Sequence, residues 1–205
     1  MRVFRFLLLS LAIVLGGCAT MPSPIKPTDD IDPSTGFLLA SMTTERNHHV
    51  MDSWFFYRRK GTDEANRIDA FGLAGLLIKP NDFGTESTSI GRLIALPLEP
   101  GEYELFTWNL YVIRYGGGYA YLAPKTQPPP HNFIINAGEI TYLGGLHIDP
   151  IMGANIIGFP LAIGGNPDIQ NQSERDFLLL EEKYPNLRGL PINKSIPDGR
   201  QWRIN

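Results

Sequence analysis

Two turn signals within residues 94–148 constrain the fold of this chain more than any other feature. Pro100-Gly101 precedes Tyr103 and Leu105, and Ala137-Gly138 lies between two further runs of aromatic and β-branched residues. Residues of these types favour strands, whereas Pro and Gly favour the tight turns that join strands. The stretch therefore predicts antiparallel strands at the centre of the fold.

The apolar residues of the first strand change parity part-way along it. Tyr103 and Leu105 share one face, whereas the apolar residues beyond them occupy even positions: Phe106, Trp108, Leu110 and Val112. Because successive side chains point to opposite faces, this switch predicts a β-bulge near Leu105-Phe106. After the second turn, a shared parity predicts one common face for Ile140, Tyr142, Leu146 and Ile148.

The rest of the chain adds short apolar segments between Gly, Pro and polar turns. The expected strands are residues 37–43, 50–58, 71–78, 89–96, 119–123 and 154–163. With 205 residues, 43% of them hydrophobic, the chain has enough apolar content for one core. We therefore predict a mainly β protein, an antiparallel β-sandwich, over residues 36–165.

One helix is expected in a C-terminal extension of residues 166–205. At the start of residues 173–184, Ser173 precedes an acid at Asp176, a spacing close to a capping box. One helical face then carries Phe177, Leu180 and Tyr184, and Pro185 ends the helix. We expect this helix to pack across a sheet face or to cover an open edge.

Residues 1–17 have the pattern of a secretory signal peptide. Arg2 and Arg5 precede a short apolar core, which is too short to span a membrane. Residues 15–18, Leu-Gly-Gly-Cys, resemble the lipobox of bacterial lipoproteins. The resemblance implies cleavage between Gly17 and Cys18 and attachment of a diacylglycerol and an acyl chain to Cys18. The alternative is a secreted protein with an incidental thiol in its signal peptide.

The residues around Cys18 also bear on where the protein is held. Ala19 follows the cysteine, which by resemblance to Gram-negative lipoproteins favours the outer membrane, facing the periplasm. Cys18 is the only cysteine, so no intramolecular disulfide is expected. Residues 18–35 contain four prolines and no hydrophobic periodicity, and we expect a flexible tether there.

The charge balance excludes one class of partner. The net charge is −3, and loss of Arg2 and Arg5 with the signal peptide leaves 16 basic and 21 acidic residues. Such a chain has no electrostatic footprint for nucleic acid. The expected partners are the membrane, through Cys18, and other envelope proteins; no cofactor is expected.

Motifs in the central stretch resemble a known pattern. Residues 100–105 read Pro-Gly-x-Tyr-x-Leu, and residues 137–144 read Ala-Gly-Glu-Ile-x-Tyr-Leu-Gly. Over residues 70–148 they are similar to bacterial lipoproteins with a transthyretin-like, carboxypeptidase-regulatory-like β-sandwich. The resemblance implies a fold and brings no catalytic residues, because its motifs are turn glycines and packing tyrosines.

His147 and Asp149 are the candidates for site chemistry. Two positions apart, they share one side of a strand, and with Glu139 they are the basis of a rival hypothesis, an envelope hydrolase or metal-binding enzyme. A histidine and a carboxylate without a third metal ligand are also common as a hydrogen-bonded pair at the protein surface, so no metal is expected. The chain lacks a G-x-S-x-G elbow, and no catalytic residue is expected.

Aromatic residues form the candidate contact surface. Residues 54–57 are consecutive aromatics, so some of them face away from the core, and tyrosines flank the glycine turn at residues 116–118. The candidates are Trp54, Phe56, Tyr111, Tyr115, Tyr119 and, beside them, Tyr121. The alternative is that the C-terminal extension covers them. We expect a non-enzymatic, lipid-anchored binding or assembly accessory, with a cell-wall or carbohydrate-binding module as a further alternative.

Overall fold

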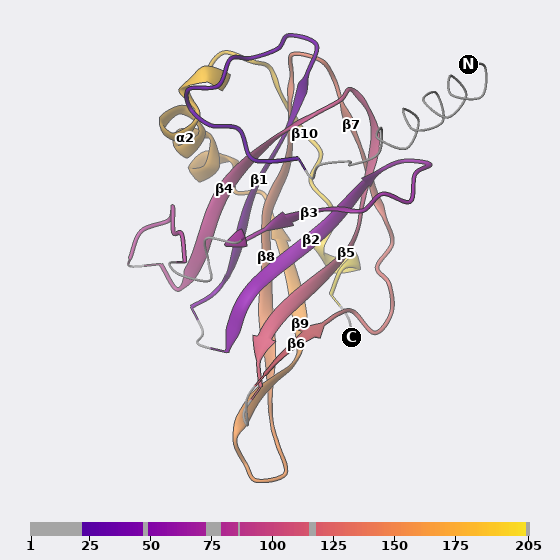
Figure 1. The fold of residues 1–205 in the computed structure, drawn as a ribbon, viewed down its shortest axis with the longest axis vertical. Helices are drawn as coiled ribbons and strands as arrows, with labels where there is room; N and C mark the ends of the chain where they lie inside the picture. The colour runs from indigo at the N-terminus through magenta and orange to yellow at the C-terminus, as the bar shows by residue number, and fades with distance from the viewer. Residues whose placement is uncertain (1–21, 47–48, 73–78, 86, 115–117, 204–205) are drawn as a thin grey trace, which may run out of the picture.

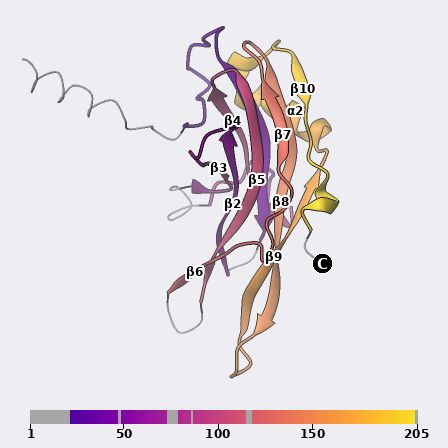
Figure 2. The same cartoon turned by 90° about the vertical axis from the view of Figure 1, so that its right-hand side faces the viewer.

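A computed structural model describes residues 22–46, 49–72, 79–85, 87–114 and 118–203. Among these residues, two five-stranded sheets face each other, and one α-helix lies on the outer face of one sheet (Figure 1, Figure 2). The predicted mainly β, two-sheet fold with a C-terminal helix is confirmed. In the described part of the chain, no helix has the length and apolar character needed to cross a membrane.

Sheet A contains the central strands of the fold. It consists of β1 (Gly36–Glu45), β4 (Ser89–Leu98), β8 (Ile140–Ala154), β9 (Pro160–Gln170) and β10 (Ile192–Lys194). Strand β8 pairs with β1 along one edge. Along its other edge it pairs first with β10 and then, further on, with β9.

Sheet B carries the aromatic segments. It consists of β2 (Val50–Arg59), β3 (Asn66–Asp69), β5 (Gly101–Ile113), β6 (Tyr119–Leu122) and β7 (His131–Ile135). Strand β2 lies between β3 and β5, and the far edge of β5 pairs with β7 near its start and with β6 near its end.

The pairing is not antiparallel throughout. Strand β8 runs parallel to both β1 and β10. The reason is the turn at Ala137-Gly138, which joins β7 of sheet B to β8 of sheet A and is therefore not a hairpin within one sheet. The chain therefore crosses from sheet B to sheet A before β8 begins, and β8 runs in the same direction as its neighbour β1.

The bulge predicted near Leu105-Phe106 is present. Phe56 pairs with Thr107 and Tyr57 with Leu105, which leaves Phe106 as the extra residue of β5. The two apolar parities of this strand therefore both face the sandwich interior, where Tyr103, Leu105, Trp108 and Leu110 are buried.

The single parity predicted for β8 is wrong. Leu39 pairs with Tyr142 and Ser41 with Gly145, so two residues of β8 lie opposite Ala40 alone. The second of them, Gly144, has φ of +93°. Because of this bulge, Tyr142 faces outward with Ile140, whereas Leu146 faces the interior with Ile148.

Two hydrophobic clusters lie on the two faces of sheet A. The inner core, between the sheets, includes Leu38, Met42, Phe55, Tyr57, Phe71 and Trp108. Trp202, from the end of the chain, is also part of the inner core and contacts Phe55 with ring centroids 5.6 Å apart. The outer cluster includes Phe37, Leu39, Tyr142, Leu180, Tyr184 and Leu187.

The helix α2 (Ser173–Lys183) covers the outer cluster, close to its predicted bounds. The predicted capping box is wrong, because Gln172 is the N-cap residue and makes no side-chain capping bond. Asp176 is fully buried and accepts hydrogen bonds of 2.6 Å from both Ser41 and Tyr142. Its carboxylate joins the helix to the sheet and does not turn back to the helix N-terminus.

The flexible tether predicted for residues 18–35 is wrong for the part that the structure describes. Ile25 is buried in the outer cluster, and its N–H donates to the carbonyl of Ala95 at 2.9 Å. Asn186 donates to the carbonyls of Lys26 and Asp29, both at 2.9 Å. Two isoleucines and local turns at Asp29 and Asp32 are enough to fix a segment whose overall composition is that of a linker.

Two other predicted strands differ from the structure. Strand β8 ends at Ala154 and β9 begins at Pro160, so the predicted strand at residues 154–163 contains a turn, with Gly158 at φ of +87°. Strand β9 also runs across the expected domain boundary at residue 165. Phe71 and Gly72 lie outside any strand, and residues 73–78 fall outside the described residues.

Candidate functional site

An aromatic row crosses the outer face of sheet B. We give this name to Trp54 of β2, Tyr111 of β5, and Tyr119 and Tyr121 of β6. The alternation of β2 puts Phe55 and Tyr57 into the inner core and Trp54 on the opposite face. The pairing of β5 with β6 places Tyr121 directly opposite Tyr111. On the other side of β5, the pairing with β2 places Asp52, two residues before Trp54, opposite Tyr111.

The rings of the aromatic row stack on one another. Trp54 and Tyr111 have centroids 6.0 Å apart with planes at 16°, and Tyr111 and Tyr121 are 4.8 Å apart at 19°. Tyr119 stacks on Tyr111 at 5.1 Å. At the end of the row, the guanidinium of Arg67 in β3 lies 4.4 Å from the Trp54 ring centroid. Aromatic pairs and cation–π contacts of this kind stabilise a fixed arrangement on the surface.

A buried carboxylate holds Trp54 in place. Asp52 accepts a hydrogen bond of 3.0 Å from the indole N–H of Trp54 and others from the backbone N–H groups of Ser53, Phe71 and Gly72. Burial raises the pKa of Asp52, and the hydrogen bond from Trp54 opposes that rise. One carboxylate thus connects the aromatic row to the backbone after β3.

The outer tyrosines remain exposed. Tyr119 and Tyr121 have 59% and 62% of their surface accessible, whereas Trp54 is buried beneath its neighbours. Desolvation and the nearby phenols of Tyr121 and Tyr119 raise the pKa of Tyr111, so its hydroxyl is protonated at neutral pH. The row therefore presents the phenol rings of Tyr119 and Tyr121 to solvent.

The structure places most of the predicted contact residues near one another, and their role as a contact surface stays a prediction. Trp54, Tyr111 and Tyr119 lie together on one face, with Phe56 in contact with Trp54 at 6.4 Å; Tyr115 lies outside the described residues. The C-terminal extension does not cover them, because α2 and β10 lie on sheet A. Arg67 was missed, since only the β2–β3 pairing brings it to Trp54. Asp52 was also missed, although its spacing of two residues places it on the same face of β2 as Trp54.

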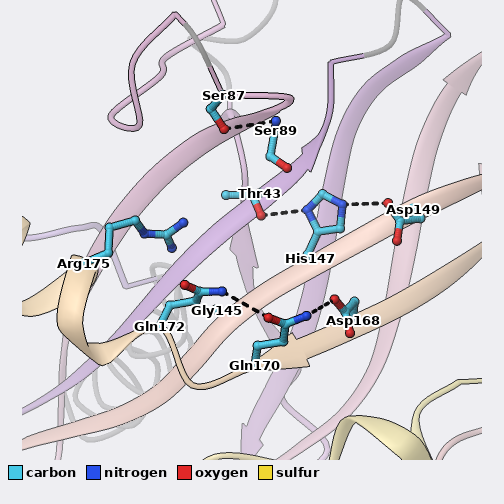
Figure 3. A pocket seen from close by; sticks show the side chains of 10 residues that line it. All are labelled: Thr43, Ser87, Ser89, Gly145, His147, Asp149, Asp168, Gln170, Gln172 and Arg175. Carbon is cyan, nitrogen blue, oxygen red and sulfur yellow. Dashed lines mark hydrogen bonds and ion pairs between the residues drawn. The ribbon is translucent and has the colours of Figure 1, made fainter.

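A polar cleft opens on the outer face of sheet A, below the area that α2 covers (Figure 3). Its volume is about 260 Å³, and its lining residues are Thr43, Ser87, Ser89, Gly145, His147, Asp149, Asp168, Gln170, Gln172 and Arg175. The outward residues of β1 and β8 are apolar where α2 packs and small or polar beyond the β8 bulge. The cleft begins at that change.

His147 lies between Thr43 and Asp149 in the cleft (Figure 3). Its Nδ1 is 2.8 Å from the Thr43 hydroxyl, and its Nε2 is 2.9 Å from a carboxylate oxygen of Asp149. The predicted pair is therefore brought together, but Glu139 is not. Glu139 precedes the other end of β8 and accepts hydrogen bonds from Asn136 and Asn193.

The cleft presents hydrogen-bonding side chains, among them the carboxylates of Asp149 and Asp168 and the guanidinium of Arg175. Among the described residues, no three His, Cys, Asp or Glu side chains are arranged to hold a metal ion. Thr43 is buried in mid-strand and paired with Gly91 and His147, so its backbone belongs to the sheet and not to an oxyanion-binding turn. Sequence reasoning missed Asp168, which β8–β9 pairing places opposite His147.

Comparisons with known proteins do not identify the chain. No protein-family model, curated protein or solved structure matches it. The resemblance to lipoproteins with a transthyretin-like sandwich therefore stays a prediction, and the function has to be argued from the two surfaces above.

Proposed function

We propose that this chain is a non-enzymatic, lipid-anchored protein of the cell envelope that binds a protein partner through the aromatic row. The observation that carries the proposal is the stack of Tyr111 with the exposed rings of Tyr119 and Tyr121, on a sheet face that α2 and β10 do not cover. Tyrosine and tryptophan dominate the energetics of protein contact surfaces, and here neighbouring rings already fix their rotamers. The lipobox at Cys18 supports anchoring to the outer membrane with the domain in the periplasm.

The geometry of the rings favours a protein partner over a glycan. A sugar stacks on an open aromatic face, but the faces of Trp54 are occupied by Arg67 and Tyr111. Tyr111 is likewise stacked between its neighbours. Tyr119 and Tyr121 contribute exposed ring surface and phenol hydroxyls, and these suit the mixed apolar and hydrogen-bonding surface of a folded protein or peptide.

The polar cleft supports the second candidate, an envelope hydrolase or metal-binding enzyme. The observation in its favour is the line of Thr43, His147 and Asp149. The burial of Thr43 and the two-ligand donor set count against it. Metal analysis of the purified protein separates the hypotheses: a stoichiometric ion lost in His147→Ala favours the second candidate.

The anchor is tested by cell fractionation. The native chain is expected in the outer membrane fraction, because several acyl chains attach a protein stably where one does not. Cys18→Ser is expected to release the protein from membranes. A Cys18→Ser chain that sediments with membranes as the native chain does would contradict lipid anchoring.

The binding surface is tested by affinity purification from detergent-solubilised membranes. The native chain is expected to retain a stoichiometric protein partner. The variant Tyr119→Ser/Tyr121→Ser is expected to lose at least nine-tenths of it; a tenfold loss of affinity corresponds to about 1.4 kcal/mol of binding free energy. Ile134→Ser, which changes a similarly exposed residue of the same sheet, is the matched control and should retain the partner. Equal recovery with all three chains, or recovery of cell-wall fragments in place of a protein, contradicts the proposal.

A further inference from the structure

The hairpin formed by β8 and β9 extends beyond the end of the sandwich and has an apolar tip (Figure 1, Figure 2). We define the hairpin tip as residues 155–159, between the two strands. Ile156 and Ile157 are almost wholly exposed, with relative accessibilities of 105% and 76%, and Phe159 is half exposed. Exposed side chains of this size in one projection mark a contact with an apolar partner.

The hairpin carries no charge between Asp149 and Asp168. Its shaft adds further exposed apolar side chains, those of Ile151, Met152 and Ile163. These residues come from both strands and continue the apolar surface from the tip toward the sandwich. A hairpin without charged side chains is better suited to an apolar medium that surrounds it than to a protein partner that would cover only one of its faces.

Four of the five backbone N–H groups of the tip are hydrogen-bonded within the tip. The side-chain oxygen of Asn155 accepts hydrogen bonds from the N–H groups of Ile157 at 3.0 Å and Phe159 at 2.9 Å. The N–H of Asn155 donates to the carbonyl of Phe159, and that of Gly158 donates to the carbonyl of Asn155, both at 2.9 Å. Pairing of these four N–H groups lowers the cost of moving the tip into an apolar medium, because fewer donors are left unsatisfied.

We propose that the hairpin tip inserts into the interfacial region of a lipid bilayer. The tip lacks the Trp, Tyr and Arg anchors that characterise protein contact sites and consists of Ile, Phe and Gly around one satisfied Asn. Insertion is shallow, because the outer edges of a two-stranded ribbon have unpaired backbone groups that need water or headgroups. Ile156, Ile157 and Phe159 enter the acyl boundary while Asp149 and Asp168 remain in water.

This contact is separate from the lipid attachment expected at Cys18. Pro22, the first described residue, lies beside Leu98 and Glu99. Leu98 pairs with Gly36 at the start of β1, whereas the hairpin continues from the other end of β1, where Thr44 pairs with Ile148. The tip therefore binds lipid in a chain that carries no acyl group, which makes the two contacts independent in an experiment.

The test is flotation with phosphatidylcholine vesicles of a chain that begins at Ala19 and contains every described residue. The chain is expected to float with the vesicles, and Ile156→Ser/Ile157→Ser is expected to lower the partition coefficient at least tenfold. Leu178→Ser is the matched control, since Leu178 is an aliphatic residue of α2 with 74% exposure, and it should float as the parent does. A parent that stays with the soluble fraction, or a tip variant that floats equally well, overturns the proposal.

A second measurement places the tip in the bilayer directly. Because Cys18 is the only cysteine, Ile157→Cys in the chain from Ala19 carries a single thiol for an environment-sensitive fluorophore. Vesicles are expected to shift its emission to the blue, while the same label at Leu178→Cys does not respond. A tip label that responds to raised protein concentration and not to vesicles shows self-association and overturns lipid insertion.

Discussion

The carboxylate of Asp176 in α2 accepts a hydrogen bond of 2.6 Å from the hydroxyl of Tyr142 in β8. Ser41 of β1 donates to the same carboxylate oxygen at 2.6 Å, and the Arg175 guanidinium lies 2.8 Å from the other. These hydrogen bonds join the helix to β1 and β8 of sheet A, next to the polar cleft that Arg175 lines. Burial and the Asp176 carboxylate both raise the pKa of Tyr142, so the phenol is a stable donor.

Replacement of Asp176 by Ala is expected to destabilise the protein. It leaves the Tyr142 and Ser41 hydroxyls and the Arg175 cation without their buried acceptor, and we expect a loss of about 2–4 kcal/mol in the free energy of unfolding. Glu174→Ala, an exposed acid on the same helix, should change stability by less than about 0.5 kcal/mol. Equal urea midpoints for the two variants would show that Asp176 does not join the helix to the sheet.

Removal of two buried tyrosine hydroxyls is expected to have opposite results. The Tyr57 hydroxyl is buried in the inner core without a hydrogen-bond partner among the described residues, and burial raises its pKa. Tyr57→Phe should leave stability unchanged or raise it by about 1 kcal/mol, because it removes an unsatisfied donor. Tyr142→Phe should lower stability by about 1–2 kcal/mol, because Asp176 loses a donor. Thermal unfolding that ranks the variants the other way contradicts this hydrogen-bond assignment.

His131 makes stability depend on pH. Its Nε2 is 3.0 Å from the carbonyl oxygen of Ser195, and burial lowers its pKa from the ordinary value of 6.5. The unfolded chain therefore binds a proton more readily than the folded chain, and stability falls as the pH drops below 6.5. Urea midpoints of the native chain at pH 7.5 and 5.5 are expected to differ more than those of His131→Gln. A variant with the same pH dependence as the native chain assigns the effect to other groups.

The bulge in β8 depends on Gly144. Its φ is +93°, and a Cβ there would lie 2.7 Å from the carbonyl oxygen of Gln170. Gly144→Ala combines backbone strain with this clash and should cost more than about 2 kcal/mol of stability. Gly84, at φ of +80° with open space around it, is the control for strain alone, and Gly84→Ala should cost about 1 kcal/mol. Equal losses would mean that β8 accommodates the methyl group by shifting.

Local patterns in the sequence predicted the features that depend on neighbouring residues. The parity switch at Leu105-Phe106 is visible in the alternation itself, and the bulge is there. The helix over residues 173–184 follows from its apolar period and from Pro185, and it is also there. The outward position of Trp54 and Phe56, opposite to Phe55 and Tyr57, follows from consecutive rings on one strand.

Features that depend on tertiary pairing were beyond the sequence. Tyr142 and Leu146 have the same parity, but Gly144 absorbs an extra residue against β1 and turns them to opposite faces. Ile25 lies in a proline-rich segment, but the outer cluster, which includes Ala95, buries it. Arg67 and Trp54 are brought into contact only by the β2–β3 pairing, and Asp168 and His147 only by the β8–β9 pairing.

The central claim, a protein partner at the aromatic row, is tested most directly by photocrosslinking in cells. A photoreactive phenylalanine analogue at position 121 replaces an exposed ring of the row, and the same analogue at position 178 replaces an exposed residue of α2 on the other sheet. We predict that irradiation joins the chain to one envelope protein from position 121 and not from position 178. Absence of a crosslinked protein at position 121, or the same products from both positions, would contradict the account.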